Sequence, residues 1–206
     1  MCNRFDFKAK ANFAGISLIE LLLFIVIVGV GVSGVLAAFR LSVQKSADPL
    51  ARKQVVAIAE SLLEEVELMP FTYCDPDDAN ALTATSATVV GINGCATTVE
   101  GLGPEAGESR YATGGLQFDN VSDYHGYNSA AETPSGIKDV SGTAIPALTS
   151  YNASVTIAST ALGSIPAGGS FATSDALLIS VTVTGPGNTA ATLHGYRTRY
   201  APRSTP

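Results

Sequence analysis

The chain has 206 residues and a formal net charge of -6, with 15% charged and 46% hydrophobic residues. An acidic chain poor in Lys and Arg lacks the basic face that binding to nucleic-acid phosphates requires, so nucleic acid is not expected as a partner. The length leaves room for an N-terminal anchor and one modest globular domain.

The most informative stretch lies near the N-terminus. Residues 21–39 contain no charge and no proline, and Arg40 follows them. About 20 apolar residues in a helix, each rising 1.5 Å, cross the hydrocarbon core of a bilayer. The run therefore predicts one membrane-spanning helix. It is longer than the roughly 7–15 apolar residues of a cleavable secretory signal, and no small-x-small cleavage site follows it.

Glu20 stands at the head of this apolar run, shortly after a basic segment that carries Arg4, Lys8 and Lys10 and ends at Gly15. A carboxylate beside lipid-compatible residues is costly and requires a partner. Removing one partner of such a buried pair costs roughly 3–5 kcal/mol, although the pair itself is close to neutral. We therefore expect Glu20 to order an assembly. An ordinary anchor with an incidental glutamate is the alternative.

These residues resemble the N-terminus of type IV prepilins. In that family a basic leader ends in Gly, here Gly15, and a Glu occupies the fifth mature position, here Glu20. The resemblance implies cleavage after Gly15, N-methylation of the new terminal Ile16, and pairing of Glu20 with the terminal ammonium of a neighbouring subunit. Two departures are Ile16, where Phe or Met is commoner, and Ala37, where many major pilins carry a kinking Pro.

The resemblance also implies partners and a location. The expected partners are the prepilin peptidase/methyltransferase, other major and minor pilins, the inner-membrane pilus assembly platform and the membrane itself. The leader would stay cytoplasmic and the C-terminal domain periplasmic, before the protein enters a pilus. Charge alone leaves the orientation open, because Lys and Arg residues lie on both sides of the span.

A second helical pattern follows the span. Asp48 suits an N-cap and Pro49 a first helical position. Apolar residues then recur at helical spacing on one face: Val55, Ile58, Ala59, Leu62, Leu63, Val66 and Met69. They predict an amphipathic helix over residues 40–69 that requires a sheet as its packing partner. Continuous with the span, this helix would be about 80 Å long, and Pro49 would either kink it or split it.

The strand signals come late in the chain. Apolar and polar residues alternate over residues 151–157 and 177–183, and a turn at 185–188 leads into a returning arm over 191–200. A short strand is also expected at residues 87–90. The predicted fold is α+β and pilin-like, with a long N-terminal helix packed on a C-terminal antiparallel sheet. The expected parts are a leader (1–15), a membrane and assembly helix (16–39), an amphipathic helix (40–69) and a β-rich globular domain (70–206).

Two cysteines remain after removal of the leader, which contains Cys2. Cys74 and Cys95 form an isolated pair, and a disulfide closing this loop would contribute roughly 3 kcal/mol in an oxidising periplasm. A two-thiolate metal site is the alternative. It is less favoured because neither histidine, His125 or His194, is close to the cysteines in sequence.

An acidic stretch follows the first of these cysteines. Its hard oxygen ligands make it a candidate calcium site, formed by Asp75, Asp77, Asp78 and Asn80. No EF-hand spacing is present, which favours a turn beside the disulfide instead. Asp119 and Asp123 would strengthen the calcium prediction by joining the group in space, but a strand end with a tight turn also accounts for residues 118–127. No other cofactor is expected.

Enzyme motifs do not stand out. We find no G-x-S-x-G, phosphate-loop lysine or H-E-x-x-H pattern, so catalysis is not expected. Residues 48–54, 57–65, 70–80 and 119–124 resemble the minor pilins of the mannose-sensitive haemagglutinin (MSHA) class, which implies a low-copy subunit that initiates or caps a pilus. Two alternatives remain: a type II secretion minor pseudopilin, or a membrane-tethered periplasmic domain that binds calcium or another ligand.

Overall fold

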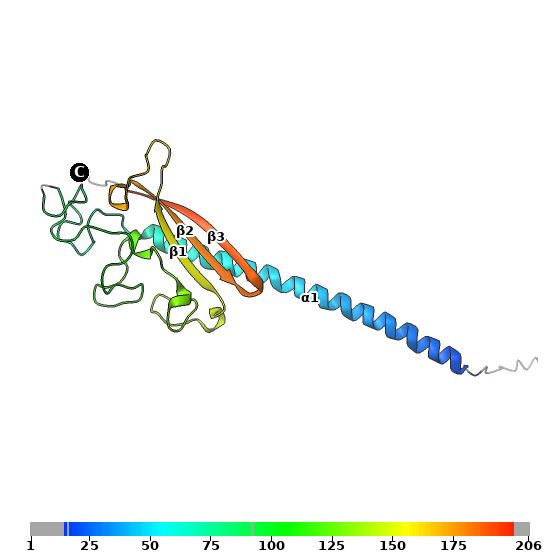
Figure 1. Ribbon diagram of the computed structural model, residues 1–206. Helices are drawn as coiled ribbons and strands as arrows, with labels where there is room; N and C mark the ends of the chain where they lie inside the picture. The colour runs from blue at the N-terminus through cyan, green and yellow to red at the C-terminus, as the bar shows by residue number, and fades with distance from the viewer. Residues whose placement is uncertain (1–14, 16, 92, 200–206) are drawn as a thin grey trace, which may run out of the picture. The chain divides into compact units, whose positions relative to one another are not determined.

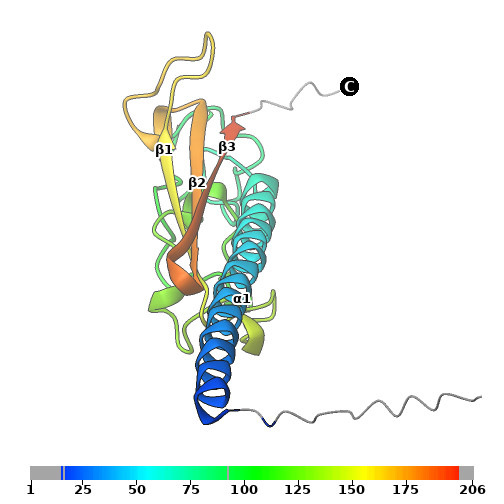
Figure 2. The same cartoon turned by 90° about the vertical axis from the view of Figure 1, so that its right-hand side faces the viewer.

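The computed structural model describes residue 15, residues 17–91 and residues 93–199, and of residues 44–48 and 172 only the backbone is described. The predictions for Ile16 and for residues 1–14 of the leader, Cys2 included, lie outside the described residues. The chain divides into two compact units, Met1–Ala47 and Asp48–Pro206, and each is described by itself. The elements, one long helix and one antiparallel sheet, are those of an α+β protein (Figures 1 and 2).

The helix α1 extends over Leu18–Leu68 and has 51 residues. Pro49 lies inside it, so the span and the amphipathic segment belong to one helical element rather than two. The helix ends just before Met69-Pro70, because the residue before a proline is disfavoured in helical conformation. The observed end lies one residue before the end predicted at residue 69.

The described residues of the first unit lie mostly in the apolar part of α1. Its membrane-span candidate covers Leu18–Val43, 26 residues with a mean hydropathy of 2.8, and none of it is buried within the protein. Length and composition therefore suit a membrane anchor, as predicted. An uncovered apolar surface of this extent needs lipid or other helices around it.

The second unit contains a three-stranded antiparallel meander in the order β1-β2-β3. The strands are β1 (Asn152–Ser159), β2 (Ala176–Gly185) and β3 (Thr189–Thr198), so all three late strand predictions are confirmed. In the register, Val155 of β1 faces Val181 of β2, which faces Leu193 of β3. The predicted turn between β2 and β3 is present, with positive φ at Gly187 and Asn188.

The core lies between the sheet and the part of α1 that belongs to the second unit. The three strands run alongside this part of the helix in Figure 1. The buried helix positions keep the predicted spacing, and the strands contribute every second residue from β1 and β2. The buried members from these elements are Val55, Ala59, Leu62, Val66, Ala153, Val155, Ile157, Leu177, Ile179, Val181 and Val183.

The region between α1 and β1 differs from the prediction. The strand expected at residues 87–90 is absent: Val89 makes only an isolated bridge to Cys95, and Val90 has a φ of 53°, which interrupts an extended backbone. Residues 121–124 form a 3-10 helix instead of a strand end. The side chains of Asn120 and Asp123 form its capping box with nearby backbone amides. These local hydrogen bonds take the place of the bonds between strands that a β-strand would make. Tyr124 is buried rather than half-buried.

At Gly195, β3 approaches α1 closely. A Cβ atom built there would lie 2.0 Å from Glu67 Oε1 and 2.9 Å from Leu63 Cδ1, and Gly195 is itself buried. Gly195→Val is therefore expected to lower the free energy of unfolding by about 1–3 kcal/mol through overpacking. Urea unfolding of the full chain in detergent measures the effect. Ala190→Val, at an exposed β3 position, is the control, and equal stability of the two variants would contradict the prediction.

Candidate functional site

The N-terminal end of α1 carries the residues predicted to act in assembly. The Ser17 carbonyl accepts hydrogen bonds from the Glu20 and Leu21 amides, each at 3.0 Å, so Glu20 lies in the first turn. The helix dipole favours a carboxylate at this position. Within the described part of the chain, no side-chain partner of Glu20 is found.

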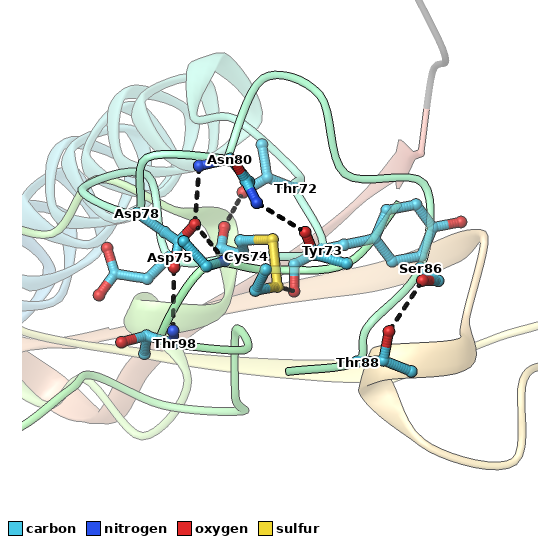
Figure 3. The surroundings of a disulfide bond; sticks show 12 residues. Thr72, Tyr73, Cys74, Asp75, Asp78, Asn80, Ser86, Thr88 and Thr98 are labelled. Carbon is cyan, nitrogen blue, oxygen red and sulfur yellow. Dashed lines mark hydrogen bonds between the residues drawn. A yellow bond between two sulfur atoms is a disulfide. The ribbon is translucent and has the colours of Figure 1, made fainter. Parts of the chain in front are cut away.

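Cys74 and Cys95 form the predicted disulfide, with Cα atoms 5.4 Å apart and a sequence separation of 21 (Figure 3). Both residues are fully buried and pack with Ala81 and Ala84 in a small core of their own. The bridge therefore replaces the two-thiolate metal site that was the alternative. Residues 73–75 lie beside residues 99–100. Cys74 and Val99 form an isolated antiparallel β-bridge, and the Glu100 amide donates a hydrogen bond to the Tyr73 carbonyl.

Asp78 holds the disulfide loop together. Its carboxylate accepts backbone hydrogen bonds from Thr98 at 2.9 Å, Ala96 at 2.9 Å and Thr97 at 2.7 Å (Figure 3). The Thr98 N–H, followed by the other amides, keeps the pKa of Asp78 well below its ordinary value. Asn80 likewise donates from its side chain to the Gly94 carbonyl at 3.1 Å. These two members of the predicted calcium set therefore bind the backbone.

The other two members, Asp75 and Asp77, join Asp119, as the calcium hypothesis anticipated for Asp119. One carboxylate oxygen from each of the three lies within 4.8 Å of the others. Asp75 also belongs to a second group, with Glu105 and Glu108. A third group combines Glu100, Glu105 and Asp123. We call the residues of these three overlapping groups the acid cluster: Asp75, Asp77, Glu100, Glu105, Glu108, Asp119 and Asp123.

The three glutamates of the acid cluster were missed by sequence reasoning. Glu100, Glu105 and Glu108 lie in a stretch rich in Gly and Pro, which predicts a loop but not its path. The only signal was the number of acidic residues in that loop. Their convergence on Asp75 and Asp123 depends on the disulfide and on backbone contacts between distant segments.

Burial and mutual repulsion act together in the acid cluster. Burial, with repulsion from Asp123, raises the pKa of Glu100 to about 9. Burial also raises the pKa of Asp123 to about 6 and, with repulsion from Asp75, that of Asp119 to about 6. The pKa of Glu105 is raised for the same reason. Without a counter-ion, these groups hold protons at pH values where carboxylates are ordinarily charged.

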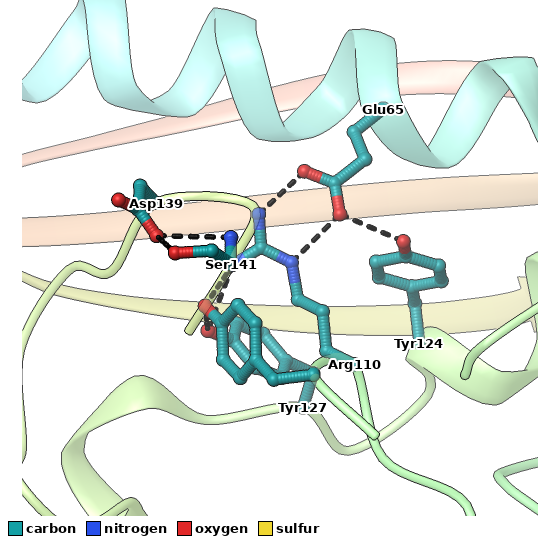
Figure 4. A network of polar contacts seen from close by, with 7 residues as sticks. Glu65, Arg110, Tyr124, Tyr127, Asp139 and Ser141 are labelled. Atoms are coloured by element: carbon teal, nitrogen blue, oxygen red, sulfur yellow. Dashed lines mark hydrogen bonds and ion pairs between the residues drawn. The ribbon is translucent and has the colours of Figure 1, made fainter. Parts of the chain in front are cut away.

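A second polar network connects α1 to the loops. The Glu65 carboxylate accepts from Arg110 Nε at 2.7 Å and from the Tyr124 hydroxyl at 2.8 Å, and Arg110 Nη2 forms an ion pair with it (Figure 4). Burial acts to raise the pKa of Glu65, but the bonds from Arg110 and Tyr124 outweigh it and lower that pKa. Arg110 also lies over the rings of Tyr111 and Tyr127. This network attaches the loop around Arg110 to the helix.

The two histidines take part in structural hydrogen bonds. His125 Nδ1 accepts from the Ile157 amide of β1 at 3.1 Å. His194 of β3 lies across the strand pair from Ser180, with its Nδ1 atom 2.9 Å from the Ser180 Oγ. Neither histidine belongs to the acid cluster.

Comparison with known proteins returned no match: no family model, no curated protein and no solved structure matches this chain. Functional inference therefore depends on two features of the chain itself. The first is Glu20 at the head of the uncovered apolar helix. The second is the partly buried acid cluster beside the disulfide.

The acid cluster predicts a pH dependence for the metal-free protein. The folded state retains a proton on Glu100 between the ordinary pKa of 4.5 and about 9, so it binds more protons than the unfolded state. The contribution of Glu100 to stability is therefore complete below pH 4.5 and is lost as the pH rises toward 9. In EGTA, the free energy of unfolding should fall by up to about 1.4 kcal/mol per pH unit over this range.

Urea unfolding in EGTA at several pH values measures this slope. The charged groups that act on Glu100 are Asp123, Glu105 and Asp75, and Glu100 in turn interacts with Arg199. Glu100→Gln is expected to flatten the slope above pH 6, where the pKa of Asp123 has been passed. An identical slope in the variant would contradict the assignment to Glu100.

Proposed function

We propose that this chain is a prepilin-type membrane protein that acts as a minor pilin of an MSHA-class type IV pilus, similar to the MshD subunits of such pili. It is processed after Gly15, N-methylated at Ile16 and inserted in the inner membrane with its C-terminal unit in the periplasm. It then enters the filament as a structural subunit. The observation that carries the proposal is Glu20 in the first turn of an uncovered apolar helix.

The exposure of the span supports assembly. All of Leu18–Val43 is uncovered within the protein, so the bilayer covers it before assembly and neighbouring helices cover it afterwards. Leaving the bilayer for a helical bundle costs little for such a surface, since lipid tails and aliphatic side chains are equally apolar. The same helix thus serves as membrane anchor and as filament core.

Glu20 sets the register between neighbouring subunits of the proposed filament. No side-chain partner is found for it in the described residues, and a carboxylate among apolar helices requires one. The terminal ammonium of a neighbour's Ile16 has the complementary charge and is created only by cleavage after Gly15. An unpaired buried charge costs much more free energy than the formed pair contributes. This contact therefore selects the one stagger between subunits in which Glu20 is paired.

The second unit supports export. The buried Cys74–Cys95 bridge suits an oxidising compartment such as the periplasm. The apolar face of α1 packs on the β-meander, so the helix that anchors the protein is also the main support of its exported unit. A type II secretion minor pseudopilin would use the same anchor, and co-purification with sheared pili distinguishes the two.

Glu20→Ala tests the charge-pairing step. The variant should insert in the membrane as the unaltered chain does, because removing a charge favours insertion, but its recovery in sheared filaments should fall at least about tenfold, consistent with loss of roughly 3–5 kcal/mol of pairing. Immunoblots of membrane and filament fractions measure both quantities. Glu64→Ala, at an exposed α1 position of the second unit, is the control. Full incorporation of Glu20→Ala would refute the assembly role of Glu20.

Gly15→Phe tests the processing step. A bulky side chain next to the scissile bond should block cleavage, so the protein should keep its leader and its larger mass. N-terminal sequencing and intact-mass analysis of the membrane-bound protein check this outcome. Gly34→Ala is the control, since a Cβ at position 34 meets no atom within 4 Å. A mature N-terminus other than Ile16 in the unaltered protein, or a leader that is never removed, favours a membrane-tethered domain that does not assemble.

A further inference from the structure

Two carboxylate oxygens in the acid cluster are buried without any hydrogen-bond partner: Glu100 Oε2 and Asp123 Oδ1. The residues that carry them are 2% and 0% exposed. A buried carboxylate oxygen without a partner costs free energy, so native proteins satisfy such atoms with a donor, an ion or ordered water. These two atoms therefore point to a ligand.

Both carboxylates are held in place through their other oxygen. Asp123 Oδ2 accepts from the amides of Asn120 at 2.7 Å and Asp119 at 3.0 Å, as part of the capping box of the 3-10 helix. Glu100 Oε1 accepts from the Ser122 hydroxyl of the same helix. The backbone of Glu100 is in turn fixed to Tyr73 beside the disulfide. Each residue is thus anchored by one oxygen and presents the second.

The spacing of the acid cluster suits one cation. Ligand oxygens from Glu100, Glu105 and Asp123 lie within 4.8 Å of one another. Oxygens that bind one Ca²⁺ at roughly 2.3–2.6 Å lie at most about 5 Å apart, so this spacing is compatible with shared coordination. Asp75 connects this group through Glu105 to further carboxylates, which can complete a coordination number of roughly 6–8.

Among the residues that the structure describes, the cation that acts on Glu100 forms no ion pair with it. Arg199 interacts electrostatically with Glu100, but its guanidinium lies between the rings of Phe71 and Tyr73, 3.8 and 3.9 Å from their centroids. Within the described part of the chain, its Nη1 and Nη2 atoms are buried and form no hydrogen bond. Either protons or a bound cation must therefore neutralise the buried carboxylates.

We propose that Glu100, Glu105 and Asp123 bind a calcium ion, with Asp75 and its neighbours in the acid cluster completing the coordination. Calcium fits because all the offered ligands are carboxylate oxygens on loops and a short 3-10 helix, which tolerate its irregular geometry. Mg²⁺ demands a stricter octahedron and retains water, and Zn²⁺ prefers nitrogen and sulfur ligands. The site joins residues 73–75, 99–108 and 119–123, so the ion stabilises the loops of the second unit. The proposal is independent of the pilin function.

The test uses the full chain in detergent, freed of metal with EGTA and dialysed. Calorimetric titration with CaCl₂ should show saturable binding. Added calcium should also raise Tm, and the rise should grow with the calcium concentration. Near-ultraviolet circular dichroism of the seven tyrosines monitors the thermal unfolding. Binding should release protons, visible as a dependence of the heat on the buffer's ionisation enthalpy, because the carboxylates must lose them to bind the ion. MgCl₂ at equal concentration should give a smaller shift in Tm.

Two variants assign the site. Glu100→Gln keeps the shape of the side chain and should weaken calcium binding by about tenfold or more. Glu105→Gln, at a more exposed ligand, should also weaken calcium binding. It provides the test if Glu100→Gln does not fold. Glu64→Gln, on the exposed face of α1, should bind as the unaltered chain does. Absence of saturable binding and of a Tm shift in the unaltered chain, or full affinity in both ligand variants, would overturn the proposal and leave protonation as the means of neutralisation.

Discussion

The packing of one face of α1 against the antiparallel sheet supports the second unit. Val55, Ala59, Leu62 and Val66 are spaced so that one stripe of the helix shares a single core with the inward-facing residues of β1 and β2. Burying each large aliphatic side chain contributes roughly 1.5–3 kcal/mol, so this contact is the main apolar stabilisation of the unit. Gly195 permits the close approach of β3 to the same helix. Everything between α1 and β1 is attached to this frame.

That intervening region has little regular structure, and polar side chains give it its shape. Asp78 and Glu100 illustrate two opposite solutions for a carboxylate near the same disulfide. Asp78 accepts several backbone hydrogen bonds, which stabilise its charge and lower its pKa. Glu100 is buried with one donor and acidic neighbours, which raises its pKa. The first is fully satisfied by the protein, whereas the second requires a proton or a cation.

The two units place different demands on the chain. The apolar span needs an environment without water, and Glu20 at its head needs a positive partner, so both requirements are met by membrane insertion followed by assembly in the proposed pilin. The second unit needs an oxidising compartment for its disulfide and, in our proposal, a cation for its acid cluster. The periplasm of the proposed orientation would supply the oxidising conditions for the disulfide.

The sequence by itself determined the elements whose signal is local. Nineteen residues without charge or proline predicted the span, helical spacing predicted the buried face of α1, and alternation predicted all three strands. The disulfide followed from a single isolated cysteine pair. Periodicity is a property of neighbouring residues, so it is visible before folding.

The tertiary structure alone decided which polar residues meet. Asp78 and Asn80 lie close to Asp75 in sequence, yet they bind the backbone of residues 94–98. Asp123, in contrast, meets Glu100 and Glu105 from a 3-10 helix farther along the chain. The missing strand at residues 87–90 has the same origin, because Val90 takes a left-handed backbone conformation within the disulfide loop. Such arrangements depend on loop paths fixed by a covalent bridge and by contacts between distant residues, and no local pattern records them.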